Sequence, residues 1–293
     1  MSPAATPPPR PGLWAERAAA GLFFAAAPRL PRRLQPEPPE GLLPWEHLAV
    51  ERDGGLDPLG ATWYPTSGAR GAVLLLHPWV NGGRTYFHRR GRIEALRQEG
   101  YHALTVDFGG FGGTRRRLGF LDIEVEAALA VLRRRAGDLP LHVWGVSAGA
   151  YWAHMVLARR DGVLGAMFED VSPHLLEWSW RMAPVGRPAY LFFRTTLRRA
   201  YRYLDIRLHA PALTVRAASY VGGGRDRGVG PEDTRILAEA AGARHLIVPA
   251  ADHLGSIQLA NQEVIALALD TFRRAEDELS GGRRAPSRRT GAP

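Results

Sequence analysis

The sequence predicts an α/β protein built on one mostly parallel sheet with helices on both faces. Short apolar segments alternate with segments of helical periodicity between residues 46 and 279, and this order places helices across parallel strands. Residues 71–77 are a continuous apolar run, which is typical of a strand buried on both faces. The 293-residue chain, with 45% hydrophobic residues, suits one large domain better than two.

Eight strands are expected, the first two as an antiparallel edge and the others in the parallel part of the sheet. They are residues 46–52, 60–64, 71–77, 101–107, 141–145, 165–170, 212–216 and 245–249. The helices expected between them are residues 85–99, 120–136, 148–160, 231–241 and 261–279. In such a sheet, ligands bind at the carboxyl ends of the strands, so each candidate residue can be judged by its place relative to a strand.

A long connection between two sheet strands, residues 172–210, predicts a small helical cap over the strand ends. We expect two helices there. An apolar cap favours a substrate with an acyl or other hydrophobic group, and simple packing of the insert is the alternative. The connection mixes apolar side chains with arginines: Leu175, Leu176, Trp178, Trp180, Tyr190, Leu191, Phe192 and Phe193, with Arg181, Arg187, Arg194, Arg198 and Arg199.

Both ends of the chain differ from the domain in composition. Residues 1–11 are rich in proline and are expected to be disordered, as is the polar, basic tail 280–293. Residues 13–27 are expected to form a short apolar helix, and a Pro-rich linker follows it. The expected division is therefore an N-terminal region 1–44, a domain 45–279 and the tail.

The short apolar helix near the N-terminus leaves two interpretations open. Its ten-residue apolar stretch is too short to span a bilayer, which takes about 20 residues. In the first interpretation it is a helix of the mature protein, which packs on the domain or lies on a membrane surface. In the second it is the apolar part of a signal peptide, with Arg10 and Arg17 ahead of the apolar run. Glu16 and Pro28 argue against a signal peptide. We therefore expect a cytoplasmic protein, with the helix as a candidate for peripheral membrane contact.

Cysteine content and charge exclude several classes of function. The chain has no cysteine, so disulfides, thiolate metal sites and a cysteine nucleophile are all excluded. All 38 basic residues are arginine, and the formal net charge is +9. No nucleic-acid-binding motif accompanies this charge, so no nucleic-acid partner is expected. The charge favours solubility and a weak attraction to anionic membranes or acidic substrates.

The segment Gly145-Val146-Ser147-Ala148-Gly149 fits the pattern G-x-S-x-G between a predicted strand and a predicted helix. A serine on such a tight turn, a nucleophile elbow, stands clear of the backbone. Glycines are needed on either side because a Cβ would meet the neighbouring strand and helix. The new helix directs free N–H groups and its positive dipole end at whatever the serine attacks. A Gly-rich turn with a solvent-exposed serine is the alternative, since the pattern alone is common.

Two further residues at strand ends fit a catalytic triad. His253 follows the last predicted strand and is the best base for Ser147, whose hydroxyl is a poor nucleophile unless its proton is removed. Asp226 follows the penultimate strand and is the favoured acid to orient the histidine and stabilise its charged form. Asp170, at the end of another strand, and Asp252, next to the histidine, remain alternatives for the acid.

The chain resembles the α/β-hydrolase superfamily over about residues 48–274, because its candidate residues follow the order Ser, Asp, His. Residues 107–114 are similar to the D-x-R-G-x-G-x-S turn of the serine-aminopeptidase-like and dienelactone-hydrolase-like branches, with Gly109 in place of the usual arginine. The resemblance implies an α/β-hydrolase fold, with Ser147 as nucleophile, Asp226 as acid and His253 as base.

An oxyanion hole needs two backbone donors. One is expected to be the N–H of Ala148, directly after the candidate nucleophile. The loop that begins at His77 reads H-P-W-V-N-G-G and resembles the family's H-G-x-x-x-G. Pro78 has no N–H to donate, so Trp79 is the expected second donor, or Val80 if the loop is shifted by one residue. The histidine itself is expected to play a structural part by bonding loop backbone.

Together these features predict a serine hydrolase that cleaves a carboxylic ester or a related acyl bond through an acyl-enzyme on Ser147. Carboxylesterase is the favoured class, and thioesterase and serine-aminopeptidase-like activity are alternatives. The expected partner is a small acyl-type substrate with an apolar group, and neither a cofactor nor a metal is expected. The competing interpretation is a non-catalytic protein of the same fold that binds a ligand or acts at a membrane surface, and the intact triad argues against it.

Overall fold

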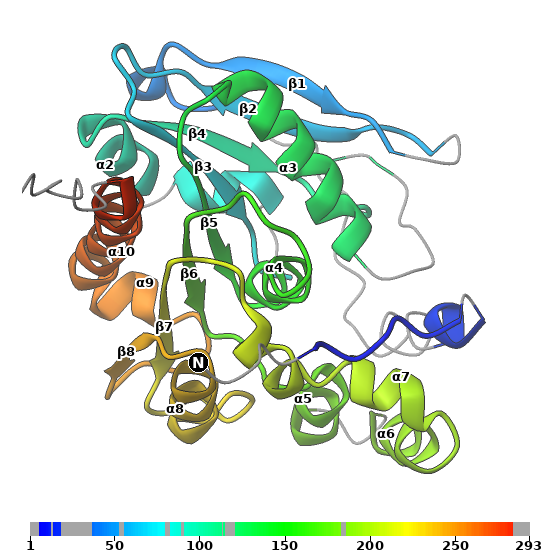
Figure 1. Ribbon diagram of the computed structural model, residues 1–293. Coiled ribbons are helices and arrows are strands. Elements are labelled where there is room, and N and C mark those ends of the chain that lie inside the picture. Colours follow the sequence, from blue (N-terminus) through cyan, green and yellow to red (C-terminus); the bar gives the residue numbers. More distant parts are fainter. Residues whose placement is uncertain are drawn as a thin grey trace, which may run out of the picture.

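The computed structural model describes residues 6–12, 14–18, 37–52, 56–79, 83–88, 91–112, 114, 121–182 and 186–283. Its eight-stranded sheet has the order β1-β2-β4-β3-β5-β6-β7-β8 (Figure 1). β1 and β2 pair antiparallel at one edge, and β3 to β8 run parallel. The strands are β1 (Glu46–Val50), β2 (Leu59–Tyr64), β3 (Gly71–Leu76), β4 (Tyr101–Val106), β5 (Leu141–Val146), β6 (Gly165–Glu169), β7 (Ala217–Gly223) and β8 (Arg244–Val248).

Helices cover both faces of this sheet, which explains why β3, at its centre, is apolar at every position. Successive residues of β3 belong to different cores, with Leu74 packing toward one face and Leu75 toward the other. One face is covered by α3 (Asp122–Ala136), α4 (Ala148–Leu157) and α8 (Pro231–Ala240). The other face is covered by α2 (Arg92–Gln98) and α10 (Asn261–Arg283), preceded by the short α9 (Ser256–Leu259).

The predicted strand at residues 212–216 is wrong, because the penultimate strand is β7 (Ala217–Gly223). The chain before it forms a 3-10 turn at Ala210–Ala212 and then a loop. Thr214 fixes this loop, since its hydroxyl donates to the carbonyl oxygens of Leu157 and Arg160 at 2.9 and 2.8 Å. β7 is rich in alanine and glycine, which have low β-propensity, but its place between β6 and β8 overrides that preference.

The predicted helix at residues 85–99 consists of two shorter elements in the structure. A 3-10 helix covers Gly83–His88, and α2 begins at Arg92. Gly91, at the N-cap of α2, has φ of 71°. This left-handed conformation interrupts a continuous helix and favours glycine.

The connection between β6 and β7 carries α5 (Leu175–Met182), α6 (Gly186–Thr195) and α7 (Arg198–Tyr203), which we call the cap. The described residues of this connection thus form three α-helices, where two were expected. Figure 1 shows α5 next to α8, to which the Arg181–Asp233 ion pair joins it, and α6 farthest from the sheet. The two ends of the cap meet, because His174 and Asp205 form an antiparallel β-bridge.

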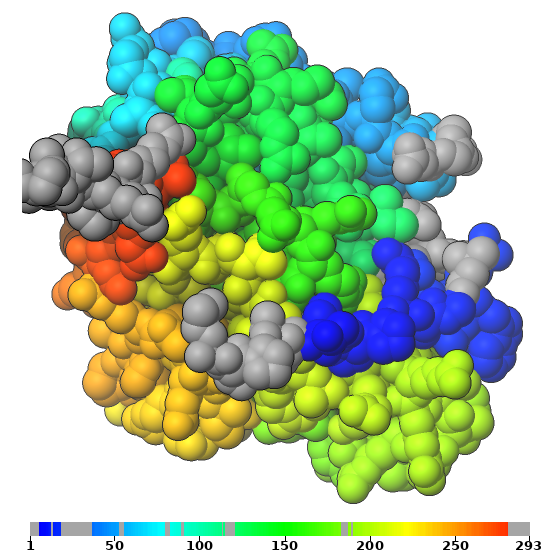
Figure 2. Space-filling model, in the orientation of Figure 1, coloured from blue at the N-terminus to red at the C-terminus, as the bar shows by residue number. Residues whose placement is uncertain are grey.

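Residues near the N-terminus lie against the domain, although their proline content predicted disorder. Arg10 donates to the carboxylates of Glu16 and Asp122, both at 2.9 Å. The hydroxyl of Tyr203, at the end of α7, donates to the same Asp122 at 3.0 Å. A buried carboxylate needs such a cation, and this contact places residues 6–12 beside the cap (Figure 2).

The expected apolar helix 13–27 lies mostly outside the described residues, although 14–18 are helical. The tail begins later than expected, since α10 continues to Arg283, and residues 284–293 lie outside the described residues. Among the described helices, none combines the length and apolar character that crossing a membrane would take.

Candidate active site

Ser147 lies on the sharp turn between β5 and α4. Its backbone has φ of 50° and ψ of −112°, a conformation that non-glycine residues rarely adopt. A Cβ on Gly145 would lie 2.6 Å from the backbone nitrogen of Ala150, and a Cβ on Gly149 would lie 2.1 Å from the carbonyl oxygen of Leu76. The two glycines therefore allow helix and strand to approach closely enough to form the strained turn.

The structure brings Ser147, His253 and Asp226 into one hydrogen-bonded chain. The serine Oγ is 2.9 Å from Nε2 of His253, and Nδ1 of the same ring is 2.6 Å from Oδ2 of Asp226. The three residues follow β5, β8 and β7, so they meet at the carboxyl edge of the parallel sheet. The imidazole keeps 25% of its surface exposed, whereas the Asp226 side chain is 1% exposed. The histidine is therefore accessible while its carboxylate partner is shielded from water.

Backbone hydrogen bonds hold the Asp226 carboxylate in this orientation. Its second oxygen, Oδ1, accepts the N–H groups of Gly228 and Val229 at 2.8 and 2.9 Å. With Oδ1 committed to the loop, Oδ2 is left for the histidine. Because a carboxylate only accepts hydrogen bonds, Nδ1 of His253 carries the proton and Nε2 faces the serine as an acceptor.

The environment of His253 favours its charged form. Burial alone would lower the pKa, but the hydrogen bond and charge of Asp226, together with the charges of Asp170 and Asp252, raise the pKa of His253 above its usual value of 6.5. An imidazole stabilised in this way is a stronger base toward a neighbouring hydroxyl.

Asp170, the main alternative acid, does not bond to the imidazole in the structure. Its Oδ2 accepts the backbone N–H of Leu254 at 3.0 Å. Asp170 and Leu254 both have positive φ, of 48° and 65°, so this bond fixes a strained turn next to His253. Burial raises the pKa of Asp170 to about 7, an effect that the positive charge of His253 reduces. Asp252 is exposed, and its backbone carbonyl accepts the N–H of Gly255 instead.

The two expected oxyanion donors lie on adjacent segments. Ala148 is the first residue of α4, where N–H groups have no partner within the helix. The loop after β3 lies against this helix, since a Cβ on Gly149 would lie 2.8 Å from the carbonyl oxygen of His77. Trp79 follows two residues later and stacks edge-on against Phe111 at 5.0 Å. Val80, the alternative donor, lies outside the described residues.

His77 ties this loop to the end of β4. Its Nδ1 lies 2.7 Å from the Pro78 carbonyl oxygen, and its Nε2 lies 3.1 Å from the Phe108 nitrogen, which donates to it. The ring is fully buried, and burial lowers the pKa of His77 to about 4. It is therefore neutral, with its proton on Nδ1, and it holds loop backbone.

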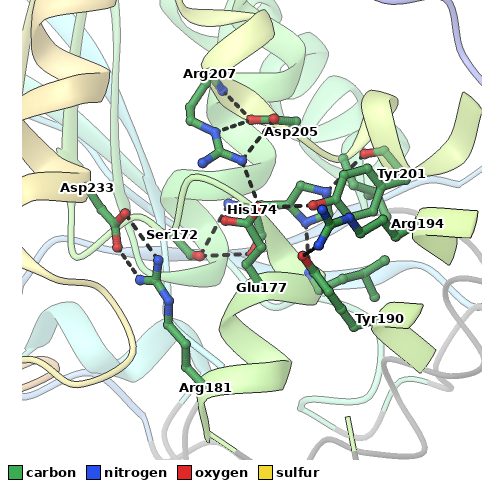
Figure 3. A network of polar contacts seen from close by, with 12 residues as sticks. Ser172, His174, Glu177, Arg181, Tyr190, Arg194, Tyr201, Asp205, Arg207 and Asp233 are labelled. Atoms are coloured by element: carbon green, nitrogen blue, oxygen red, sulfur yellow. Dashed lines mark hydrogen bonds and ion pairs between the residues drawn. The ribbon is translucent and has the colours of Figure 1, made fainter. Parts of the chain in front are cut away.

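The cap places an aromatic side chain beside the imidazole, which the sequence did not single out as a site residue. The Trp178 ring in α5 lies 6.5 Å from that of His253. Its Nε1 would be 2.6 Å from a Cβ on Gly228, in the loop that holds Asp226. α5 is fastened here because Arg181 pairs with Asp233 of α8, as Figure 3 shows. Trp178 therefore lies beside the histidine on the side of the cap.

A buried ion pair lies next to the turn that carries Ser147. The sequence did not predict this pair. Arg92 and Glu169 are fully buried and joined by two hydrogen bonds of 2.8 and 3.0 Å. The indole of Trp144 also bonds to this carboxylate, and the Ser147 N–H donates to the Glu169 backbone oxygen at 2.8 Å. Within the described part of the chain, no cluster of three or more histidine and acidic residues could hold a metal ion.

Comparison with known proteins shows similarity in structure and not in sequence. No protein-family model and no curated protein sequence matches the chain. An esterase of Pyrococcus furiosus superposes with a TM-score of 0.67 at 18% identity, covering 83% of this chain and 96% of its own. The α/β hydrolase GrgF from Penicillium gives 0.61 at 14% identity, with coverages of 80% and 99%.

A thermophilic esterase from Thermogutta terrifontis is also similar, with a TM-score of 0.54 at 17% identity and coverages of 78% and 99%. Each of the three matches covers 78% or more of this chain and nearly all of the matched chain. The chain has the α/β-hydrolase fold.

Proposed function

We propose that the protein is a serine hydrolase that cleaves a carboxylic ester or a related acyl bond through an acyl-enzyme on Ser147. The observation that supports this most directly is the hydrogen-bonded chain from the Ser147 hydroxyl through His253 to the buried carboxylate of Asp226. A base at 2.9 Å, itself oriented by an acid at 2.6 Å, is the arrangement that activates a serine hydroxyl.

In the proposed reaction, Nε2 of His253 takes the hydroxyl proton as Ser147 Oγ attacks the acyl carbon. The carbonyl oxygen becomes an oxyanion, which the N–H groups of Ala148 and Trp79 stabilise. The imidazolium, stabilised by Asp226, then gives its proton to the leaving group as the acyl-enzyme forms. A water molecule then gives a proton to His253 as its oxygen attacks the acyl carbon. The bond between the acyl carbon and Ser147 Oγ breaks, His253 returns the proton to Oγ, and the carboxylic acid product leaves.

A carboxylesterase with an apolar acyl or alcohol group is the favoured class. Trp178 lies beside the imidazole, so a substrate group next to the scissile bond meets an aromatic surface. Two of the similar structures are named as esterases. Thioesterase and aminopeptidase activities use the same chemistry and are separated from it by the leaving group.

The test combines active-site labelling with a substrate panel. A fluorophosphonate probe should label the folded protein at Ser147, and Ser147→Ala should lose both labelling and hydrolysis. Ser67→Ala, at an exposed serine, is the matched control and should keep both. p-Nitrophenyl acyl esters, acyl thioesters and aminoacyl amides then distinguish the three activities. A folded protein that is neither labelled nor active at neutral to mildly alkaline pH would disprove the proposal.

A further inference from the structure

The outer side of the cap combines exposed apolar side chains with arginines. Three of the nine exposed large apolar side chains in the described part of the chain lie here, namely Trp180, Leu191 and Phe192. Leu191 and Phe192 are 50% and 41% exposed. Neighbouring arginines on α6 and α7 are exposed as well. We define the outer cap face as Trp180, Arg187, Leu191, Phe192, Arg194 and Arg198.

Contacts between α5 and α6 make this face continuous. The Arg187 guanidinium lies 5.3 Å from the Trp180 ring, and that ring is 5.0 Å from the Tyr190 ring. Arg194 donates to the Tyr190 hydroxyl at 3.0 Å, and Figure 3 shows the two side chains directed at each other. Leu191 and Arg194 line one open groove with the two aromatic rings, and Glu177 and Arg181 complete its lining. Cationic and apolar groups are thus interleaved on one surface.

The positive charge of this surface is not neutralised locally. Residues 186–203 include five arginines and no aspartate or glutamate. Within the described residues, Arg187, Arg194 and Arg198 take part in no ion pair. The nearby carboxylate of Glu177 is bound by Arg207 at 2.9 Å, as Figure 3 shows. Glu177 borders the face, but Arg207 already binds it, so the exposed arginines are available to an anionic partner.

The outer cap face is one helix away from the candidate active site. Residues two apart on a helix point about 200° apart, so Trp178 and Trp180 lie on opposite sides of α5. Trp178 packs beside His253, and Trp180 belongs to the outer face. A surface that binds this face therefore lies beyond the cap, on the side of α5 opposite the imidazole.

We propose that the outer cap face docks on an anionic lipid bilayer. Trp180, Leu191 and Phe192 supply the apolar area that enters the headgroup boundary, and the arginines bind lipid phosphates through their planar guanidinium groups. A nucleic acid would pair with the arginines but would leave the exposed leucine and phenylalanine without an apolar environment, whereas an anionic bilayer supplies both phosphates and an apolar layer. This proposal does not depend on the chemistry of Ser147.

The experiment measures binding of the full chain to vesicles by co-sedimentation. We expect binding to phosphatidylcholine vesicles that contain phosphatidylglycerol, weak binding to phosphatidylcholine alone, and a decrease as salt screens the charges. Arg187→Ala with Arg194→Ala should lower the partition coefficient about 25-fold, at about fivefold per arginine near an anionic surface. Leu191→Ser with Phe192→Ser should also weaken binding.

Two control variants make the result specific to the cap. Arg134→Ala with Arg216→Ala removes the same charge from exposed arginines on other surfaces and should change binding less than threefold. Leu22→Ser with Phe23→Ser tests the apolar N-terminal segment. Circular dichroism confirms that each variant is folded. The proposal is overturned if wild-type protein does not bind anionic vesicles, if the arginine control loses as much as the cap variant, or if only the N-terminal variant loses binding.

Discussion

Replacing Asp226 by asparagine is the sharpest test of the proposed triad. The two side chains have the same shape, so the backbone bonds from Gly228 and Val229 to Oδ1 should persist. Those bonds require an oxygen at that position, so the new amide must place its NH2 group toward Nδ1 of His253. The imidazole then carries its proton on Nε2, facing Ser147, and cannot accept the hydroxyl proton.

We expect Asp226→Asn to lower kcat by about 10⁴-fold, which corresponds to about 5.5 kcal/mol of transition-state stabilisation. Asp170→Asn is the matched control. Its new side chain can still offer an oxygen to the Leu254 N–H, and it does not bond to the imidazole. We therefore expect a decrease of less than about tenfold for this variant.

Steady-state hydrolysis of a p-nitrophenyl ester by both variants decides the question, with circular dichroism and thermal unfolding to confirm that they fold. The expected result is a large loss of kcat for Asp226→Asn and a small one for Asp170→Asn. A larger loss for Asp170→Asn would refute the reasoning and assign the acid to the end of β6.

Three further predictions follow from the same structure. Because the pKa of His253 is raised, kcat/KM should rise with pH through an apparent pKa above 6.5. Asp226→Asn removes the charge that raises this pKa, so the rise in kcat/KM should occur at lower pH. Arg92→Met should lower the free energy of unfolding in urea by about 3–5 kcal/mol, since it leaves buried Glu169 without its cation, while adding Glu169→Leu should recover much of the loss. Gly149→Ala should destroy the elbow, because its Cβ meets backbone at 2.1 Å, and both labelling and thermal stability should fall. A stable Arg92→Met or a fully active Gly149→Ala would contradict these assignments.

The sequence predicted the sheet and the candidate triad because both depend on local patterns. A residue that follows a strand of a parallel sheet lies at its carboxyl edge, so Ser147, Asp226 and His253 could be grouped before any contact was known. The penultimate strand was predicted five residues too early, but this did not affect the grouping of the three residues, since Asp226 follows the observed strand as well. The sequence favoured Asp226 over Asp170 as the partner of the histidine, but the hydrogen bond from His253 to Asp226 depends on the loop backbone, which no pattern specifies.

Contacts between distant segments could not be predicted. Arg92 and Glu169 are 77 residues apart, and only the packing of α2 against the sheet brings them together. A glutamate ending an apolar strand does signal a buried acid in need of a partner, but the sequence holds many arginines that could serve. Trp178 and Arg10 were missed for the same reason, because a helical periodicity or a proline-rich composition does not show which element a side chain meets.

The meeting of the two ends of the cap has a consequence for how this fold can change. His174 and Asp205 pair as a β-bridge, and the Ile206 N–H donates to the Pro173 carbonyl at 2.9 Å. Since the intervening helices leave and return at one place, their length can change at a modest entropic cost, without displacing β6 or β7. Under the proposed function, the cap would contribute to substrate recognition and the strand ends would carry the chemistry. Replacing the whole segment between His174 and Asp205 would then change the surface above the site, while Ser147, Asp226 and His253 keep their places at the strand ends.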